Sequence, residues 1–232
     1  MSLAYLLHAA LVTLRISLPT VWDAARGKLT PAICDARLDY WSRKLVERAD
    51  MKISVSGTEH AVAGRSYVVM SNHQSHYDIP VLYQALPLSM RMVAKRELFR
   101  IPLWAQAMHK AGFVELDRSD RERAIESLNR SRAVLATGTS IWIAPEGTRS
   151  MSGELGPFKK GGFKLAMGVG APILPVTISG TREALPSHSR TVTPGARVRV
   201  TVHPAIESTG FAEETEDLLV ERVRAAIASA LA

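Results

Sequence analysis

Asn72, His73 and Asp78 are residues whose types and spacing suit acid–base chemistry. An Asp that accepts a hydrogen bond from one imidazole nitrogen fixes the tautomer and leaves the other nitrogen free to take a proton. On one helix, side chains five residues apart point about 140° apart, whereas a loop histidine can fold back onto a carboxylate in the next helix. We therefore expect a loop His73 that pairs with Asp78 as a general base. The alternative is a turn that the two residues only cap and solvate.

The elements around this motif support a strand-to-helix turn. Residues 66–70 are apolar and rich in Val, which predicts a buried strand, and residues 79–86 predict a helix. Pro80 favours a helix start close by, because proline is tolerated in the first turn, where its missing N–H has no partner. Asp78 is then expected in the first turn, with His73 in the loop before it.

Three further polar clusters follow predicted strands. They are Lys95 to Leu98, Asp117-Arg118, and Pro145 to Ser150, which contains Glu146, Gly147, Thr148 and Arg149. In open α/β sheets the carboxyl ends of the strands line the ligand crevice, so these clusters are expected to meet His73. Lys95, Arg118 and Arg149 would suit a bound phosphate, unless they form surface ion pairs or turns.

Strands and helices alternate along most of the chain. This pattern predicts an α/β fold with a largely parallel central sheet flanked by helices. The expected strands lie around 53–55 and at 67–70, 91–94, 112–116, 140–144, 173–178 and 197–202. A capping-box pattern at 119–122 opens a helix with Ile125, Leu128 and Leu135 on one face. A last helix at 212–231 is expected to bury Leu218, Val223, Ile227 and Leu231.

The first 50 residues predict a separate helical hairpin, and residues 51–232 form the α/β domain. The roughly 14 uncharged residues from Met1 would reach about 21 Å, short of a hydrocarbon core of about 30 Å, before Arg15 and Pro19. We expect this helix not to span a membrane and not to be a signal peptide. Thr30-Pro31 opens a second helix to Arg48. The pair is expected to lie in the membrane interface; the alternative is a soluble hairpin packed on the main domain.

Composition narrows the class of partner. The formal net charge is +7 and the pI is about 9.8, which favours an anionic partner. Aromatic content is 6% and the basic residues form no recognition helix, so no nucleic acid partner is expected. The single cysteine excludes an intrachain disulfide. His73, His76 and Asp78 invite a metal, but no other His pair has ligand spacing, so no metal is expected.

Two other motifs leave alternatives open. Ser71 and Ser75 flank the histidine, but neither lies in a G-x-S-x-G elbow, so a covalent acyl-serine is not expected. Residues 158–163 could bind a second anion through their glycines and Lys160 or Lys164. They could equally form a turn into a helix at 164–169.

Together, the clusters resemble the glycerolipid acyltransferase family that includes 1-acylglycerol-3-phosphate acyltransferases. Four of its motifs occur in order over about residues 50–205. They are matched by Asn72, His73 and Asp78, partly by Gly112 and Arg118, by Pro145 to Ser150, and by Ile173 to Val176. Two related stretches match Ala94 to Leu98 and Phe158 to Gly161. Glu115 and Ala144 stand where the family has phenylalanine, which leaves the pocket shape open.

The resemblance implies transfer of an acyl chain from acyl-CoA or acyl-carrier protein to the sn-2 hydroxyl of lysophosphatidate, giving phosphatidate, without a further cofactor. It makes His73 the base and Asp78 its orienting partner, while Arg118 and Arg149, with Lys95, hold the acceptor phosphate. Glu146, Gly147 and Thr148 belong to the acceptor loop, and turn N–H groups are expected to stabilise the oxyanion. It also implies a monotopic or peripheral protein at the cytoplasmic face of the cell membrane. The alternatives are another lysolipid or glycerol-3-phosphate acceptor, or a non-catalytic basic protein that binds anionic membranes.

Overall fold

The computed structural model describes residues 2–94, 96–101, 103–115 and 121–231, and within them it contains one seven-stranded sheet. The strand order is β1-β7-β6-β2-β5-β3-β4, and every neighbouring pair is parallel except β6 and β7. This confirms the predicted α/β fold with a largely parallel sheet. The strands are β1 Lys52–Ser56, β2 Val68–Ser71, β3 Met90–Ala94, β4 Val114–Glu115, β5 Ser140–Ile143, β6 Ile173–Ser179 and β7 Arg197–Val202.

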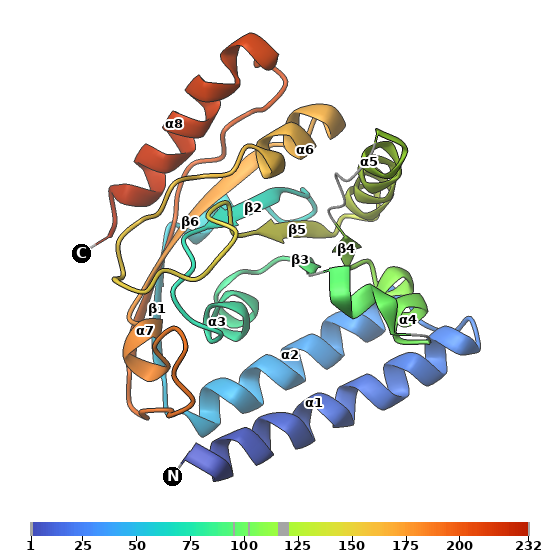
Figure 1. The fold of residues 1–232 in the computed structure, drawn as a ribbon, viewed down its shortest axis with the longest axis vertical. Coiled ribbons are helices and arrows are strands. Elements are labelled where there is room, and N and C mark those ends of the chain that lie inside the picture. Colours follow the sequence, from blue (N-terminus) through green and yellow to red (C-terminus); the bar gives the residue numbers. More distant parts are fainter. Residues whose placement is uncertain (1, 95, 102, 116–120, 232) are drawn as a thin grey trace.

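Helices cover both faces of the sheet (Figure 1). The α-helices are α1 Ser2–Ala25, α2 Pro31–Arg48, α3 Asp78–Ala85, α4 Trp104–Lys110, α5 Arg121–Ala136, α6 Gly161–Val169, α7 Thr181–Ala184 and α8 Glu216–Ala228. Short 3₁₀ turns are η1 Thr58–His60, η2 Arg96–Arg100 and η3 Glu213–Thr215. Successive strand residues point to opposite faces, so the central strands feed two cores. One core, with Val69, Trp142 and Leu174, packs under α2 and α3; the other packs under α5, α6 and α8.

The N-terminal helix is longer than the sequence predicts. The expected stop at Arg15 and Pro19 is wrong, because α1 continues through Pro19 to Ala25. The Thr20 hydroxyl donates to the Ile16 carbonyl at 2.6 Å, next to the carbonyl of Arg15 that Pro19 leaves without its usual donor. Its 24 residues reach about 36 Å. By length and composition α1 could therefore cross a membrane, contrary to the estimate of about 21 Å.

The second helix begins and ends as predicted. The Thr30 hydroxyl accepts from the Ile33 N–H, and Pro31 is the first helical residue. Side-chain bonds join α1 and α2, among them Trp41 Nε1 to Thr13 Oγ1 at 3.0 Å and an Arg37–Asp23 ion pair. The two helices lie side by side, with α1 on the outside (Figure 1). The division into domains 1–50 and 51–232 stays a prediction.

Two helix faces differ from the sequence-based expectation. In α8, Leu219 is buried and Leu218 is 45% exposed, so the predicted burial of Leu218 is wrong by one residue. In α5, Ile125 is 48% exposed, so it does not join the face that buries Leu135. The capping-box residues 119 and 120 lie outside the described residues.

Candidate active site

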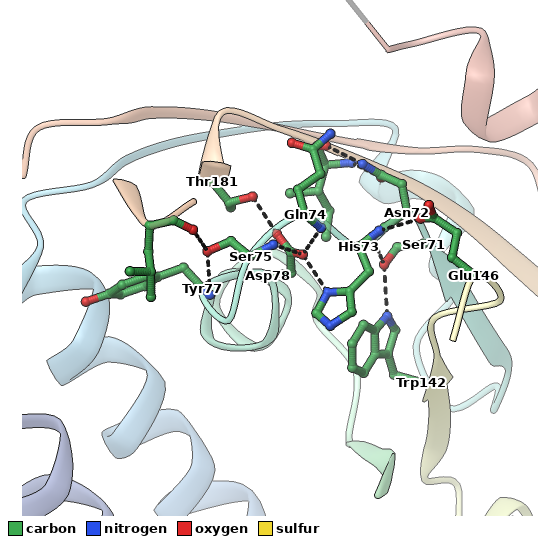
Figure 2. Close-up of polar contacts among 12 residues, drawn as sticks. Ser71, Asn72, His73, Gln74, Ser75, Tyr77, Asp78, Trp142, Glu146 and Thr181 are labelled. Carbon is green, nitrogen blue, oxygen red and sulfur yellow. Dashed lines mark hydrogen bonds and ion pairs between the residues drawn. The ribbon is translucent and has the colours of Figure 1, made fainter. Parts of the chain in front are cut away.

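His73 and Asp78 form the pair that their spacing predicts (Figure 2). His73 lies in the loop after β2, and Asp78 is the first residue of α3. The imidazole Nδ1 lies 2.7 Å from Asp78 Oδ2, and the two side chains are 15% and 0% exposed. Because a carboxylate accepts hydrogen bonds, Nδ1 carries the proton and Nε2 presents its lone pair. No hydrogen bond to Nε2 occurs among the described residues.

The Asp78 carboxylate accepts three more donors. The N–H groups of Gln74 and Ser75 reach Oδ2 at 2.7 and 2.9 Å, and the Thr181 hydroxyl reaches Oδ1 at 2.5 Å. A carboxylate removed from water needs such donors, because each unsatisfied oxygen would carry a desolvation penalty. The Asp78 side chain is therefore fixed on both oxygens. Thr181, which follows Asp78 by 103 residues, is not among the site residues predicted from the sequence.

The loop that carries His73 is fastened to the sheet by its own side chains. The Asn72 amide donates to the Ile178 carbonyl and accepts from the Ile178 N–H, both at 2.8 Å. The Ser71 hydroxyl accepts from Trp142 Nε1 at 2.9 Å. The Trp142 ring meets the imidazole edge to face, with ring centres 5.6 Å apart. Asn72 and Trp142 therefore fix the loop and one side of the His73 ring.

Glu146 holds the loop after β5 against the His73 loop. Its Oε1 accepts the His73 N–H at 2.8 Å, and its Oε2 accepts the Gly156 N–H at 2.8 Å. The residue is 5% exposed. In addition, the Ser150 N–H donates to the His73 carbonyl at 2.7 Å. The predicted meeting of these two segments at the carboxyl edge of the sheet is confirmed, and Glu146 acts there as an internal brace.

Two cations lie on the loop after β5. Arg149 is half-buried, directly before Ser150, and makes no ion pair with any described residue. Lys159 is not among the predicted site residues and lies across Gly147: a Cβ at Gly147 would be 2.8 Å from Lys159 Nζ. Gly147 has φ +71°, and with Thr148 it is exposed. Lys159 is also exposed and unpaired within the described part of the chain.

Other predicted site residues and groups have different outcomes. Lys95 and Arg118 lie outside the described residues. The N–H groups of His73, Gln74 and Ser75 bind the Glu146 and Asp78 carboxylates. The expectation that these turn N–H groups stabilise an oxyanion is therefore wrong for these three.

The stretch 158–163 is a turn into α6, which begins at Gly161. Lys160 pairs with Asp217 at 2.5 Å, and Lys164 pairs with Glu213 at 3.2 Å. Both lysines therefore neutralise acidic residues in η3 and in the first turn of α8. The alternative of a second anion site, which needs these charges free, does not fit this arrangement.

Metal binding and the ionisation of the nearby phenol bear on what the pair can do. Over the described ranges, no three His, Cys, Asp or Glu side chains are grouped to hold a metal ion. Burial raises the pKa of Tyr77 to about 12, so this phenol stays protonated at neutral pH.

An apolar cavity of about 300 Å³ lies between α1, α2 and α4. Its inner wall includes Ile79, which follows Asp78, and Met92, which pairs in register with Trp142. Trp142 in turn contacts the His73 ring. Burial also raises the pKa of Cys34, which lines the same cavity. The cavity wall thus includes the residue that follows Asp78 and the strand partner of Trp142.

Comparison with known proteins decides the family. Residues 52–179, more than half of the chain, match the model of the family described as Acyltransferase. The chain belongs to the Acyltransferase family. The matched range contains His73, Asp78, Glu146 and Arg149.

Named relatives and one solved structure extend this result. A Brassica napus chloroplastic 1-acyl-sn-glycerol-3-phosphate acyltransferase is 35% identical over 78% of this chain and 51% of its own length. The yeast 1-acyl-sn-glycerol-3-phosphate acyltransferase is 40% identical over 63% of this chain and 48% of its own. The chain thus spans about half the length of these relatives. The crystal structure of the 1-acyl-sn-glycerophosphate acyltransferase PlsC of Thermotoga maritima is 27% identical, with a TM-score of 0.77 over 97% of this chain and 92% of that one.

Proposed function

We propose that this protein transfers an acyl chain from a thioester to the sn-2 hydroxyl of lysophosphatidate, giving phosphatidate. The observation that carries the proposal is the buried Asp78 carboxylate, held 2.7 Å from Nδ1 of a histidine whose Nε2 has no partner among the described residues. Membership of the Acyltransferase family supports the reaction class. The names of the relatives support lysophosphatidate as the acceptor.

His73 Nε2 takes the proton of the acceptor hydroxyl as its oxygen attacks the thioester carbonyl. Asp78 keeps the other proton on Nδ1 and stabilises the imidazolium that forms. When the tetrahedral intermediate collapses, the C–S bond breaks, and the imidazolium returns its proton to the leaving thiolate. The proton count closes without an acyl-enzyme and without a cofactor.

Arg149 and Lys159 are the described cations best placed for the acceptor phosphate. Both belong to the loop that Glu146 fastens to the His73 backbone. Arginine matches phosphate oxygens with two N–H groups, and lysine adds a point charge. Arg118 and Lys95 are expected to complete this site, and Gly147 and Thr148 are the exposed turn over which the phosphate would pass.

The apolar cavity is proposed to hold the acyl chain of one substrate. Each buried CH₂ contributes about 0.8 kcal/mol, and about 300 Å³ lies at the lower end of the range for ligand sites. We propose that the near end of such a chain lies at Ile79, the residue after Asp78, and at Met92, the strand partner of Trp142.

The exposed face of α1 supports membrane association. This face presents large apolar side chains to solvent: Leu3, Leu7, Leu11, Leu14, Leu18 and Trp22. We propose that α1 lies in the cytoplasmic membrane surface as a monotopic anchor, and that lipid substrates reach the cavity from the bilayer. The acyl donor is acyl-CoA or acyl-carrier protein.

Thiol release from palmitoyl-CoA tests the proposal, with and without lysophosphatidate, in detergent or vesicles. Wild type should release thiol only with the acceptor, and His73→Ala should lose at least about a thousandfold in kcat, the combined loss of base and orientation. Asp78→Asn, which keeps the size of the side chain, should lose about a hundredfold or more. Wild-type rates in His73→Ala would refute the assignment of the base. Release with glycerol 3-phosphate but not with lysophosphatidate would refute the proposed acceptor.

A further inference from the structure

The buried Asp78 carboxylate has two sides with different partners. Oδ2 faces the imidazole and two backbone N–H groups of its own loop, whereas Oδ1 receives the Thr181 hydroxyl at 2.5 Å. Both residues are 0% exposed, so water cannot replace this contact. A carboxylate can only accept, which makes the Thr181 hydroxyl the donor. Among the described residues, this is the one donor on Oδ1.

The fold fixes the position of Thr181 independently of the His73 loop. Gly180 lies between β6 and α7 with φ +95°, and a Cβ there would meet the Arg197 carbonyl oxygen at 2.1 Å. Glycine therefore lets β6 turn tightly against β7. The next residue, Thr181, is the first of α7 and points at Asp78 (Figure 2).

The same segment holds the His73 loop at two other points. Asn72 exchanges two hydrogen bonds with Ile178 in β6, and the Ser75 hydroxyl donates to the Leu185 carbonyl after α7 at 2.8 Å. The segment from β6 to α7 is thus the support on which the loop rests. Of these contacts, the one from Thr181 alone reaches the acidic group that orients the histidine.

We propose that Thr181 is a positioning residue: its hydroxyl fixes the rotation of the Asp78 carboxylate, so that Oδ2 stays in line with His73 Nδ1–H. This inference rests on the proposed acyl transfer. Thr181 acts through Asp78 and His73. Loss of its hydroxyl leaves Oδ1 without a donor and lets the carboxylate turn, so that His73 loses its fixed tautomer and direction.

Thr181→Val removes the hydroxyl and nearly keeps the shape, and Thr181→Ser keeps the hydroxyl. With palmitoyl-CoA and lysophosphatidate, Thr181→Val should lower kcat about 10- to 100-fold, as expected for one lost hydrogen bond to a charged group. The KM for each substrate should change less than about threefold, because Thr181 contacts neither. Thr181→Ser should recover kcat to within about threefold of wild type. If Thr181→Val does not fold, Thr181→Ala removes the same hydroxyl without adding a methyl group.

Thr177→Val is the matched control. Thr177 is also buried in this region, but its hydroxyl donates to the Ile227 carbonyl in α8 at 2.7 Å, on the other side of the sheet from His73. This control should lose stability and keep kcat within about twofold. Equal losses of kcat in Thr177→Val and Thr181→Val would overturn the proposal, and so would failure of Thr181→Ser to recover activity.

A second readout does not depend on activity. In ¹⁵N-histidine-labelled protein, the His73 Nδ1 proton, identified by its loss in His73→Ala, should give a slowly exchanging signal in wild type, Thr177→Val and Thr181→Ser. It should broaden or disappear in Thr181→Val. An unchanged signal in Thr181→Val would overturn the positioning role even if wild type failed to transfer acyl groups. That failure by itself would refute only the proposed function.

Discussion

Glu146 can test how the site is built, because it is a buried acid whose two oxygens accept hydrogen bonds from backbone N–H groups. Its two oxygens accept the N–H groups of His73 and Gly156, each at 2.8 Å, and the residue is 5% exposed. The two donors belong to loops more than 80 residues apart in the chain. Glu146 thus joins the His73 loop to the loop that carries Arg149 and Lys159.

Glu146→Gln changes one oxygen to an NH₂ group and little else. One of the two N–H donors then faces another donor, so that a charge-assisted hydrogen bond is lost and a buried N–H is left unpaired. Such a bond contributes about 1.5–3 kcal/mol, and the remaining one weakens when the charge is removed. We expect the free energy of unfolding to fall by about 2–4 kcal/mol. A shift of the His73 backbone should also lower kcat at least about tenfold.

Urea denaturation in detergent measures the stability, and acceptor-dependent thiol release measures kcat. Glu154→Gln is the matched control, since Glu154 lies in the same loop, is exposed and forms no side-chain hydrogen bond with a described residue. It makes the same change of charge and should change stability by less than about 0.5 kcal/mol. The reasoning is refuted if Glu146→Gln is as stable and active as Glu154→Gln.

Three further predictions concern the frame around the site. Arg91 is 1% exposed and pairs with Asp35 at 2.6 Å, so Arg91→Met should lower the free energy of unfolding, measured by urea denaturation, by about 3 kcal/mol. The Asp35 side chain is 38% exposed, so Asp35→Asn should lower the same free energy by less than about 1.5 kcal/mol. Gly180→Ala should destabilise by at least about 3 kcal/mol, because a Cβ would lie 2.1 Å from the Arg197 carbonyl oxygen at φ +95°; wild-type stability would contradict this packing. Burial lowers the pKa of His203, so the unfolded chain binds a proton more readily below about pH 6.5. Stability should therefore fall between pH 7.5 and 5.5, and less steeply in His203→Gln, measured by urea denaturation at both values.

What the sequence predicts well is local. His73 and Asp78 are five residues apart, and the strand-to-helix turn between them leaves few ways to place the two side chains. Thr30-Pro31 marks the start of α2 for the same reason, because a cap and a first-turn proline act within one turn of helix. The alternation of strands and helices along the chain predicts a parallel sheet, since parallel strands need crossover connections that are usually helical.

What the sequence misses depends on contacts across the fold. Both Leu218 and Leu219 fit an apolar stripe on a helix. Only the packing of α8 on the sheet determines that Leu219 is the buried one. A proline argues against a continuing helix, yet α1 runs through Pro19. Thr181 carries no motif, but it lies three residues after the end of the strand predicted at 173–178. The strand-end rule that selected Lys95, Arg118 and Arg149 would have found it if applied to residues 173–178.

The His73 loop has little regular structure, and this has a consequence for variants of the protein. The N–H groups of His73, Gln74 and Ser75 bind buried carboxylates instead of sheet or helix partners. The shape of the loop therefore depends on the two acids, Asp78 and Glu146. In a helix or strand, many neighbouring hydrogen bonds still hold the backbone when one contact is lost. This loop has few such neighbouring bonds. Substitutions at its supports should consequently disturb the position of His73, and Thr181, although distant in sequence, is one of these supports through its hydrogen bond to Asp78.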